Sequence, residues 1–120
     1  MNIYIAAKLE MWPVLRGILL VIPPQHTVVS SWINRPKRGT NNAFEEARVD
    51  WEDLGQADLL IIDTTYPGGS GREVEFGITL ARGRPVWRVG PAPNVFHRGP
   101  FNFRIFEDWK QIIEKLRGEA

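Results

Sequence analysis

Residues 57–71 read ADLLIIDTTYPGGSG, and residues 72–89 continue as REVEFGITLARGRPVWRV. An apolar run of strand length meets a glycine-rich turn, then a segment of helical character that stops at Gly83, and then a second apolar run. This order is typical of one β-α-β unit in a parallel sheet. Its expected parts are a strand at 58–63, a loop at 64–71, a helix at 72–82 and a strand at 85–89. Ligands of open α/β sheets bind at the carboxyl edge, so the loop marks a candidate site.

The rest of the chain continues the alternation of strands and helices. Expected strands lie at 2–7, 26–32 and 103–106, expected helices at 9–22, 43–56 and 107–117, and expected loops at 34–42 and 90–102. Pro13 fits the first turn of its helix. The alternation predicts an α/β fold, a three-layer sandwich with a four- or five-stranded, mostly parallel sheet of flavodoxin-like or Rossmann-like order 2-1-3-4-5. We expect residues 1–120 to form a single domain.

Composition narrows the class of protein. The 120 residues are 43% hydrophobic and 24% charged with a net charge of +1, so nothing favours binding to a nucleic acid polymer or to a membrane. No cysteine is present, which excludes disulfides and cysteine nucleophiles. His26 and His97 stand far apart in the sequence, and we expect neither a metal nor a cofactor. No signal peptide and no membrane-spanning run is seen, so we expect a cytoplasmic protein.

Two glutamates, Glu73 and Glu75, lie in the expected first turn of the helix at 72–82. The helix dipole favours a carboxylate there and keeps it ionised, and so available as a nucleophile. Acids in a first turn also simply cap helices, and spacing alone leaves that interpretation open. Asp63 ends the strand at 58–63, at the edge where site residues collect.

Other candidates have a structural interpretation beside the functional one. Tyr4 lies in the first strand, where tyrosines more often belong to the core. Asp50 belongs to a charge run that is typical of a solvated helix face. Trp51 and Trp109 have a helical spacing that favours packing over stacking on bases. The small residues at 68–71 can present backbone amides to a phosphate, but ordinary turn chemistry explains them as well.

Four motifs, taken in order, resemble the nucleoside 2-deoxyribosyltransferase family, which includes 2′-deoxynucleoside 5′-monophosphate N-glycosidases. They are NIYIAA at 2–7, DWEDL followed by AD within 50–58, GREVEFG at 71–77 and LARGRPV at 80–86. The resemblance therefore covers most of the chain. One departure follows the first strand, where Ala7-Lys8 replaces the Gly-Pro that is common in the family.

The resemblance implies a chemistry and assigns roles to residues. Glu75 matches the family nucleophile, which attacks C1′ of a deoxynucleoside, releases the base and holds the sugar as an ester. Asp50 matches the aspartate implicated in proton transfer to the base, and Tyr4 would hold the nucleophile or the sugar. Another nucleobase or water then takes the sugar. The implied activity is that of a nucleoside 2-deoxyribosyltransferase or a 2′-deoxynucleoside (5′-monophosphate) N-glycosidase.

The resemblance also implies how the substrate is bound. Ser70 and Gly71 would face its 5′ end, near Asp63. Arg72 replaces a small or apolar residue and either binds a phosphate, which favours a nucleotide, or points to solvent. Asn94 is the candidate for a residue that a neighbouring subunit contributes. The expected partners are thus a small-molecule nucleoside or nucleotide and further copies of the chain, in a homodimer or higher homo-oligomer.

Two other functions stay open on the sequence. One is a non-catalytic nucleotide-binding or sensing domain of the same fold. The other is a glycosidase for another N-ribosyl compound, such as NAD. Geometry discriminates between an enzyme and a sensor, since the enzyme needs the Glu75 and Asp50 carboxylates in one pocket with Tyr4.

Overall fold

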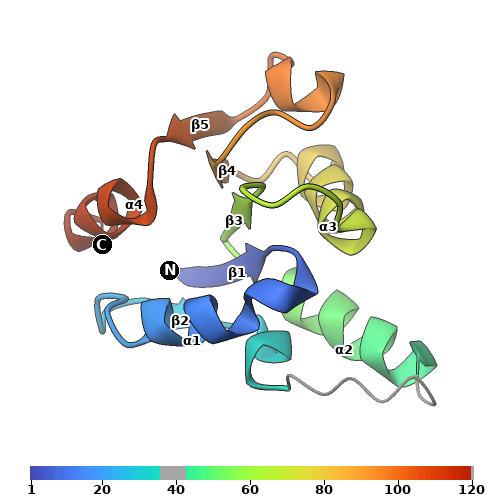
Figure 1. The fold of residues 1–120 in the computed structure, drawn as a ribbon, viewed down its shortest axis with the longest axis horizontal. Helices are drawn as coiled ribbons and strands as arrows, with labels where there is room; N and C mark the ends of the chain where they lie inside the picture. Colours follow the sequence, from blue (N-terminus) through green and yellow to red (C-terminus); the bar gives the residue numbers. More distant parts are fainter. Residues whose placement is uncertain (36–42, 120) are drawn as a thin grey trace.

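The computed structural model describes residues 1–35 and 43–119, and Figure 1 shows their arrangement. Five strands pair in parallel to form one sheet in the order β2-β1-β3-β4-β5. The strands are β1 (Asn2–Ala6), β2 (Thr27–Val28), β3 (Leu59–Asp63), β4 (Val86–Val89) and β5 (Phe103–Phe106). The predicted α/β fold class and strand order are confirmed.

Helices cover both faces of the sheet. They are α1 (Trp12–Leu19), α2 (Ala43–Gly55), α3 (Ser70–Ala81) and α4 (Trp109–Arg117), with short 3-10 helices η1 (Leu9–Met11), η2 (Ser31–Asn34) and η4 (Val95–Arg98). Helices α2 and α3 lie on one side of the sheet, and α1 and α4 lie on the other (Figure 1). For α1, α2 and α3 this division follows from right-handed crossovers, because the chain steps outward from β1 to β2 and then back across to β3. Among the described helices, none has the length and apolar character needed to cross a membrane.

The central strand is β3, whose five residues are all buried. Helices cover both of its faces and strands pair with both of its edges, which is why its sequence is a continuous apolar run rather than an alternating one. Ile61 pairs in register with Ile5 of β1 and Trp87 of β4. The core therefore lies around β1, β3 and β4. Its packing fixes the positions of the carboxyl ends of these strands.

Strand β2 is shorter than the stretch predicted at 26–32, because hydrogen bonds from side chains replace the backbone hydrogen bonds that a longer strand would make to β1. The Ile5 amide donates to the Ser30 hydroxyl at 2.9 Å, and the Trp32 indole donates to the Ile5 carbonyl at 2.8 Å. Both backbone groups of Ile5 that face β2 are thus satisfied without a strand residue. From Ser31 the chain turns into η2 instead. The predicted loop at 34–42 lies mostly outside the described residues.

Helix α3 begins at Ser70, two residues earlier than predicted. Gly68 and Gly69 both have φ near +87°, at 88° and 86°, a left-handed conformation that glycine adopts readily, and this ends the loop early. Glu73 lies in the first turn as predicted, but Glu75 is the sixth helical residue. The prediction that Glu75 lies in the first turn is therefore wrong, and the helix dipole contributes less to its ionisation than expected.

Candidate functional site

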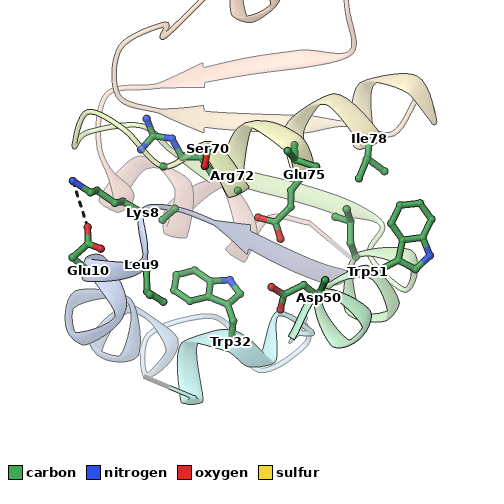
Figure 2. Close-up of a pocket in the computed structure, with 16 residues that line it drawn as sticks. Lys8, Leu9, Glu10, Trp32, Asp50, Trp51, Ser70, Arg72, Glu75 and Ile78 are labelled. Atoms are coloured by element: carbon green, nitrogen blue, oxygen red, sulfur yellow. Dashed lines mark ion pairs between the residues drawn. The ribbon is translucent and has the colours of Figure 1, made fainter. Parts of the chain in front are cut away.

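A pocket of about 560 Å³ opens beyond the carboxyl end of β1, between α2 and α3. Figure 2 shows its lining side chains, which come from the segment after β1, from η2, from α2 and from α3 as far as Ile78. The pocket contains four of the predicted site residues besides Glu75, namely Asp50, Ser70, Gly71 and Arg72. The structure thus has a pocket at the carboxyl edge of the sheet, where the sequence predicted a site.

Glu75 projects from α3 into this pocket, where Tyr4 contacts it. The Tyr4 hydroxyl donates a hydrogen bond to Glu75 Oε2. The Tyr4 side chain is fully buried, at 0% exposure, so it belongs to the core as well as to the site. A buried phenol needs a polar partner, and the half-buried glutamate supplies it. Glu75 therefore does more than cap its helix.

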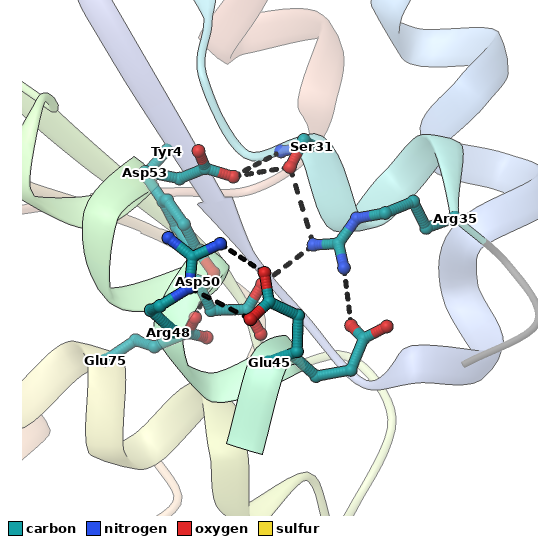
Figure 3. A network of polar contacts seen from close by, with 9 residues as sticks. Tyr4, Ser31, Arg35, Glu45, Arg48, Asp50, Asp53 and Glu75 are labelled. Atoms are coloured by element: carbon teal, nitrogen blue, oxygen red, sulfur yellow. Dashed lines mark hydrogen bonds and ion pairs between the residues drawn. The ribbon is translucent and has the colours of Figure 1, made fainter. Parts of the chain in front are cut away.

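Asp50 reaches the same pocket from α2, and a guanidinium that the sequence analysis missed holds it (Figure 3). Arg35 Nη2 lies 3.2 Å from Asp50 Oδ1, and Arg35 Nη1 lies 2.5 Å from Glu46 Oε2. Glu46 and Asp50 are four residues apart, so they share a helix face and would repel one another without a cation. That spacing of two acids is the signal from which a basic partner could have been predicted.

The neighbouring acids of α2 are also engaged, so the charge run is more than a solvated face. Asp53 Oδ2 accepts from the Ser31 amide at 3.0 Å and from the Ser31 hydroxyl at 2.6 Å, which ties α2 to η2 (Figure 3). Glu52, in contrast, is exposed and pairs with Arg48 at 2.6 Å. The face of α2 toward η2 is structured, while the opposite face meets solvent.

The end of the pocket at the start of α3 is polar and charged. Ser70 and Gly71 are exposed there, and Lys8 pairs with Glu10 at 3.4 Å on the segment after β1 (Figure 2). Arg72 does not point to solvent: it lines the pocket and its side chain is buried, at 3% exposure for the residue. That it binds a phosphate stays a prediction. Its Nη1 donates to the Tyr66 carbonyl at 2.7 Å, which braces the glycine loop.

Asp63 and Asn94 lie outside this pocket. Asp63 is buried, and its carboxylate accepts from the Thr65 amide at 2.9 Å and from the Trp109 indole at 2.8 Å, so it joins β3 to α4. Asn94 is exposed and donates to Glu73 Oε1 at 2.9 Å. It is the N-cap of η4 and belongs to the far side of α3 from Glu75. That Asn94 contributes to the site of a neighbouring subunit stays a prediction.

Behind α3, the His97 ring stacks on Phe76 with centroids 3.8 Å apart, and its Nε2 lies 2.7 Å from Glu73 Oε1. Burial lowers the pKa of His97 below its ordinary 6.5, against the smaller opposing effect of Glu73.

Within residues 1–35 and 43–119, no three His, Asp or Glu side chains gather in a way that could hold a metal ion.

The two tryptophans predicted to pack behave differently. Trp109 packs partly buried against the core. Trp51 is 56% exposed and lines the pocket, so the prediction that it packs is wrong. The reason is that α2 buries only Leu54 fully, while Ala47 and Trp51 of the same face line the cavity. The Arg82 guanidinium lies 4.9 Å from the Trp51 ring centroid.

The fold is shared with solved structures of an N-glycosidase and a deoxyribosyltransferase, which confirms the family resemblance at the level of the fold. One solved structure of this kind is the CMP N-glycosidase of Clostridium botulinum, with a TM-score of 0.68, 18% identity, and coverage of 98% of both chains. Another is the 2-deoxyribosyltransferase of Bacillus psychrosaccharolyticus, with a TM-score of 0.67, 22% identity, and coverage of 97% of this chain and 96% of that one. No family profile and no curated protein sequence matches the chain.

Proposed function

We propose that the protein cleaves the N-glycosidic bond of 2′-deoxynucleosides or their 5′-monophosphates through a deoxyribosyl ester on Glu75, and passes the sugar to another nucleobase or to water. The observation that carries this proposal is the meeting of three side chains from separate elements. Glu75 of α3 and Asp50 of α2 line one pocket, and Tyr4 of β1 donates to Glu75. Two structural neighbours, named as an N-glycosidase and a deoxyribosyltransferase, support it.

Each residue has a defined task in the proposed reaction. The Glu75 carboxylate attacks C1′, the bond from C1′ to the base nitrogen breaks, and its electron pair leaves with the base. The base takes a proton delivered through Asp50, as the second carboxylate does in retaining glycosidases. Water or a second base then attacks C1′, the ester bond to Glu75 breaks, and Asp50 takes up the proton that the attacking group loses, which restores both carboxyl groups. Tyr4 fixes one Glu75 oxygen throughout, so that the other oxygen is aimed at C1′.

The 5′ end of the substrate is proposed to lie at the start of α3, by Ser70 and Gly71. Backbone amides at a helix N-terminus favour an anion, and the Lys8 ammonium, which pairs with Glu10, lies at the same end of the pocket. We therefore place 5′-monophosphates first among the substrates. Arg72 contributes indirectly, because it braces the loop that presents these amides.

The test is a panel of deoxynucleosides and deoxynucleoside 5′-monophosphates, with CMP included because one structural neighbour is named as a CMP N-glycosidase. Released base is followed by chromatography, with and without a second free base. We expect release with at least one substrate, and a loss of roughly a thousandfold or more in Glu75→Gln. Exchange into the second base would identify a transferase.

The matched control is Glu73→Gln, since Glu73 lies on the same helix, is also half-buried and does not line the pocket. It should keep activity close to that of the unmodified protein. A trapped sugar adduct on Glu75, detected by mass spectrometry after acid quenching, would support the ester. If no substrate is cleaved while nucleotides still bind, the enzyme proposal fails and a sensing domain takes its place.

We further propose that the active form is a homo-oligomer, with Asn94 near the partner's pocket. Asn94 begins η4, where Val95 and Phe96 are exposed apolar side chains that a second copy would cover. Sedimentation of the intact chain tests this directly. A monomer at working concentrations that retains full activity would contradict it.

A further inference from the structure

The pocket has two unlike ends. In Figure 2, Lys8 and Glu10 lie at one end, Trp51 and Ile78 lie at the other, and Glu75 stands between them. The first end carries charges and the exposed start of α3. The second end is apolar, because Ala47 and Leu54, which also line the pocket, are four and three residues from the tryptophan on α2. A ligand that spans the pocket therefore needs one polar end and one flat or apolar end.

Helix α3 sets the spacing between these ends. Gly71, Glu75 and Ile78 line the pocket at intervals of four and three residues, so they succeed one another along one helix face. Side chains at such intervals stand about 5–6 Å apart. When C1′ of a bound nucleoside lies at Glu75, its C5′ end points one turn back toward Gly71. The base, attached at C1′, then points one turn forward toward Ile78 and Trp51.

Trp51 has the properties of a stacking surface. Its indole is 56% exposed, whereas Trp32 of the same pocket is 4% exposed. The Arg82 guanidinium, 4.9 Å from the ring centroid, orients the indole by a cation–π contact. A large aromatic ring left open beside a cavity gains apolar burial when a ligand covers it. Nucleobases stack on such rings irrespective of sequence, because every base has a π face.

We infer that Trp51, held in orientation by Arg82, is the surface on which the base of the substrate stacks. This inference rests on the proposed function for the position of the sugar. It adds a determinant of substrate binding from α2 that is separate from the reacting groups.

The experiment compares Trp51→Ala, Trp51→Phe and the control Phe44→Ala. Phe44 is a second exposed aromatic of α2, at 82% exposure, and it does not line the pocket. Binding of a deoxynucleoside 5′-monophosphate and of 2-deoxyribose 5-phosphate, which lacks the base, is measured by calorimetry in the Glu75→Gln background. Thermal unfolding of every variant verifies that it is folded.

We expect Trp51→Ala to weaken nucleotide binding by about tenfold or more and to leave binding of the sugar phosphate unchanged. Trp51→Phe keeps an aromatic face and should stay within about threefold of the parent, and Phe44→Ala should match it. An equal loss for both ligands, or no loss for the nucleotide, would overturn the inference. If nucleotides bind through Trp51 but the protein with Glu75 intact turns over none of them, the stacking site stands and the enzyme proposal fails. If the protein cleaves substrates and Trp51→Ala leaves KM unchanged, the enzyme proposal stands and the stacking inference fails.

Discussion

At the scale of single residues, the contact between Tyr4 and Glu75 is where packing and chemistry meet. Tyr4 is fixed on every side by the core, since it lies in β1 and pairs in register with Leu60 of β3. A side chain held that firmly gives its hydroxyl one position. Glu75 is half-buried on a helix and has more freedom of its own. The hydrogen bond from this rigidly held hydroxyl therefore restricts the position of the Glu75 carboxylate, the proposed nucleophile.

Replacing Tyr4 by phenylalanine should remove this orientation while it keeps the ring in the core. A hydrogen bond to a charged group contributes about 1.5–3 kcal/mol. Lost from the transition state, this corresponds to a fall of about tenfold to a hundredfold in kcat. Base release by Tyr4→Phe measures it. Tyr66→Phe, at the other tyrosine of the chain, is the control, because Tyr66 is exposed. Equal rates in Tyr4→Phe and the unmodified protein would contradict the proposed role.

The local patterns alone did not single out the candidate residues, because they left Glu75 as a possible helix cap and Asp50 as part of a solvated face. The resemblance to a family singled them out, and the structure has both at one pocket. Arg35 was missed because its partners, Glu46 and Asp50, lie 11 and 15 residues further along the chain. Trp51 was misassigned because periodicity identifies the apolar face of a helix but not whether protein or a cavity faces it.

At the scale of elements, Arg35 joins η2 to α2 beneath the pocket. Its guanidinium spans Glu46 and Asp50, and it is partly buried with them. Figure 3 shows that Ser31 and Asp53 make a second link between the same two elements. The position of Asp50 is thus a property of this junction and not of α2 alone.

Arg35→Ala should therefore lower kcat/KM by about tenfold or more, because a carboxylate displaced by an ångström loses much of its effect on the reaction. Arg35→Lys should recover part of this loss, since a lysine carries the charge but lacks the fork that bridges two carboxylates. The control is Arg48→Ala on the solvent face of α2, where Arg48 pairs with Glu45 and Glu52. Exposed pairs contribute little, so its activity should not change. A similar loss in Arg48→Ala would show that any change in the charge of α2 has this effect.

The elements themselves were predictable to different degrees. Strand β3 and strand β5 were foreseen closely, since an apolar run between turn residues has few alternative structures. Strand β2 was not, because its length depends on Ser30 and Trp32 bonding to Ile5, a tertiary contact that β propensity does not contain. The early start of α3 was missed for a local reason, the left-handed conformation of Gly68 and Gly69.

At the scale of the whole molecule, His97 links the connection after β4 to the helix that carries Glu75. Its ring stacks on Phe76 and meets the edge of Phe103, and Arg88 of β4 donates to its carbonyl at 3.0 Å. The charged groups that face it are Glu73 and Arg72 of α3 and Arg88. Three elements therefore depend on one ring that is packed in its neutral form.

Burial lowers the pKa of His97 below 6.5, and this gives the stability of the fold a pH dependence. As the pH falls below about 6.5, the unfolded chain takes up a proton on this ring that the folded chain still refuses. The free energy of unfolding should therefore be highest above that pH and should fall toward the lower folded pKa. Its slope from one proton is at most about 1.4 kcal/mol per pH unit. His97→Gln keeps a donor for Glu73 but cannot titrate, so its stability should vary less between pH 7.5 and 5. Urea unfolding of both proteins across this range isolates the ring, because all other titrating groups are common to the two chains. Parallel pH curves would show that the folded protein protonates His97 as readily as the unfolded chain does.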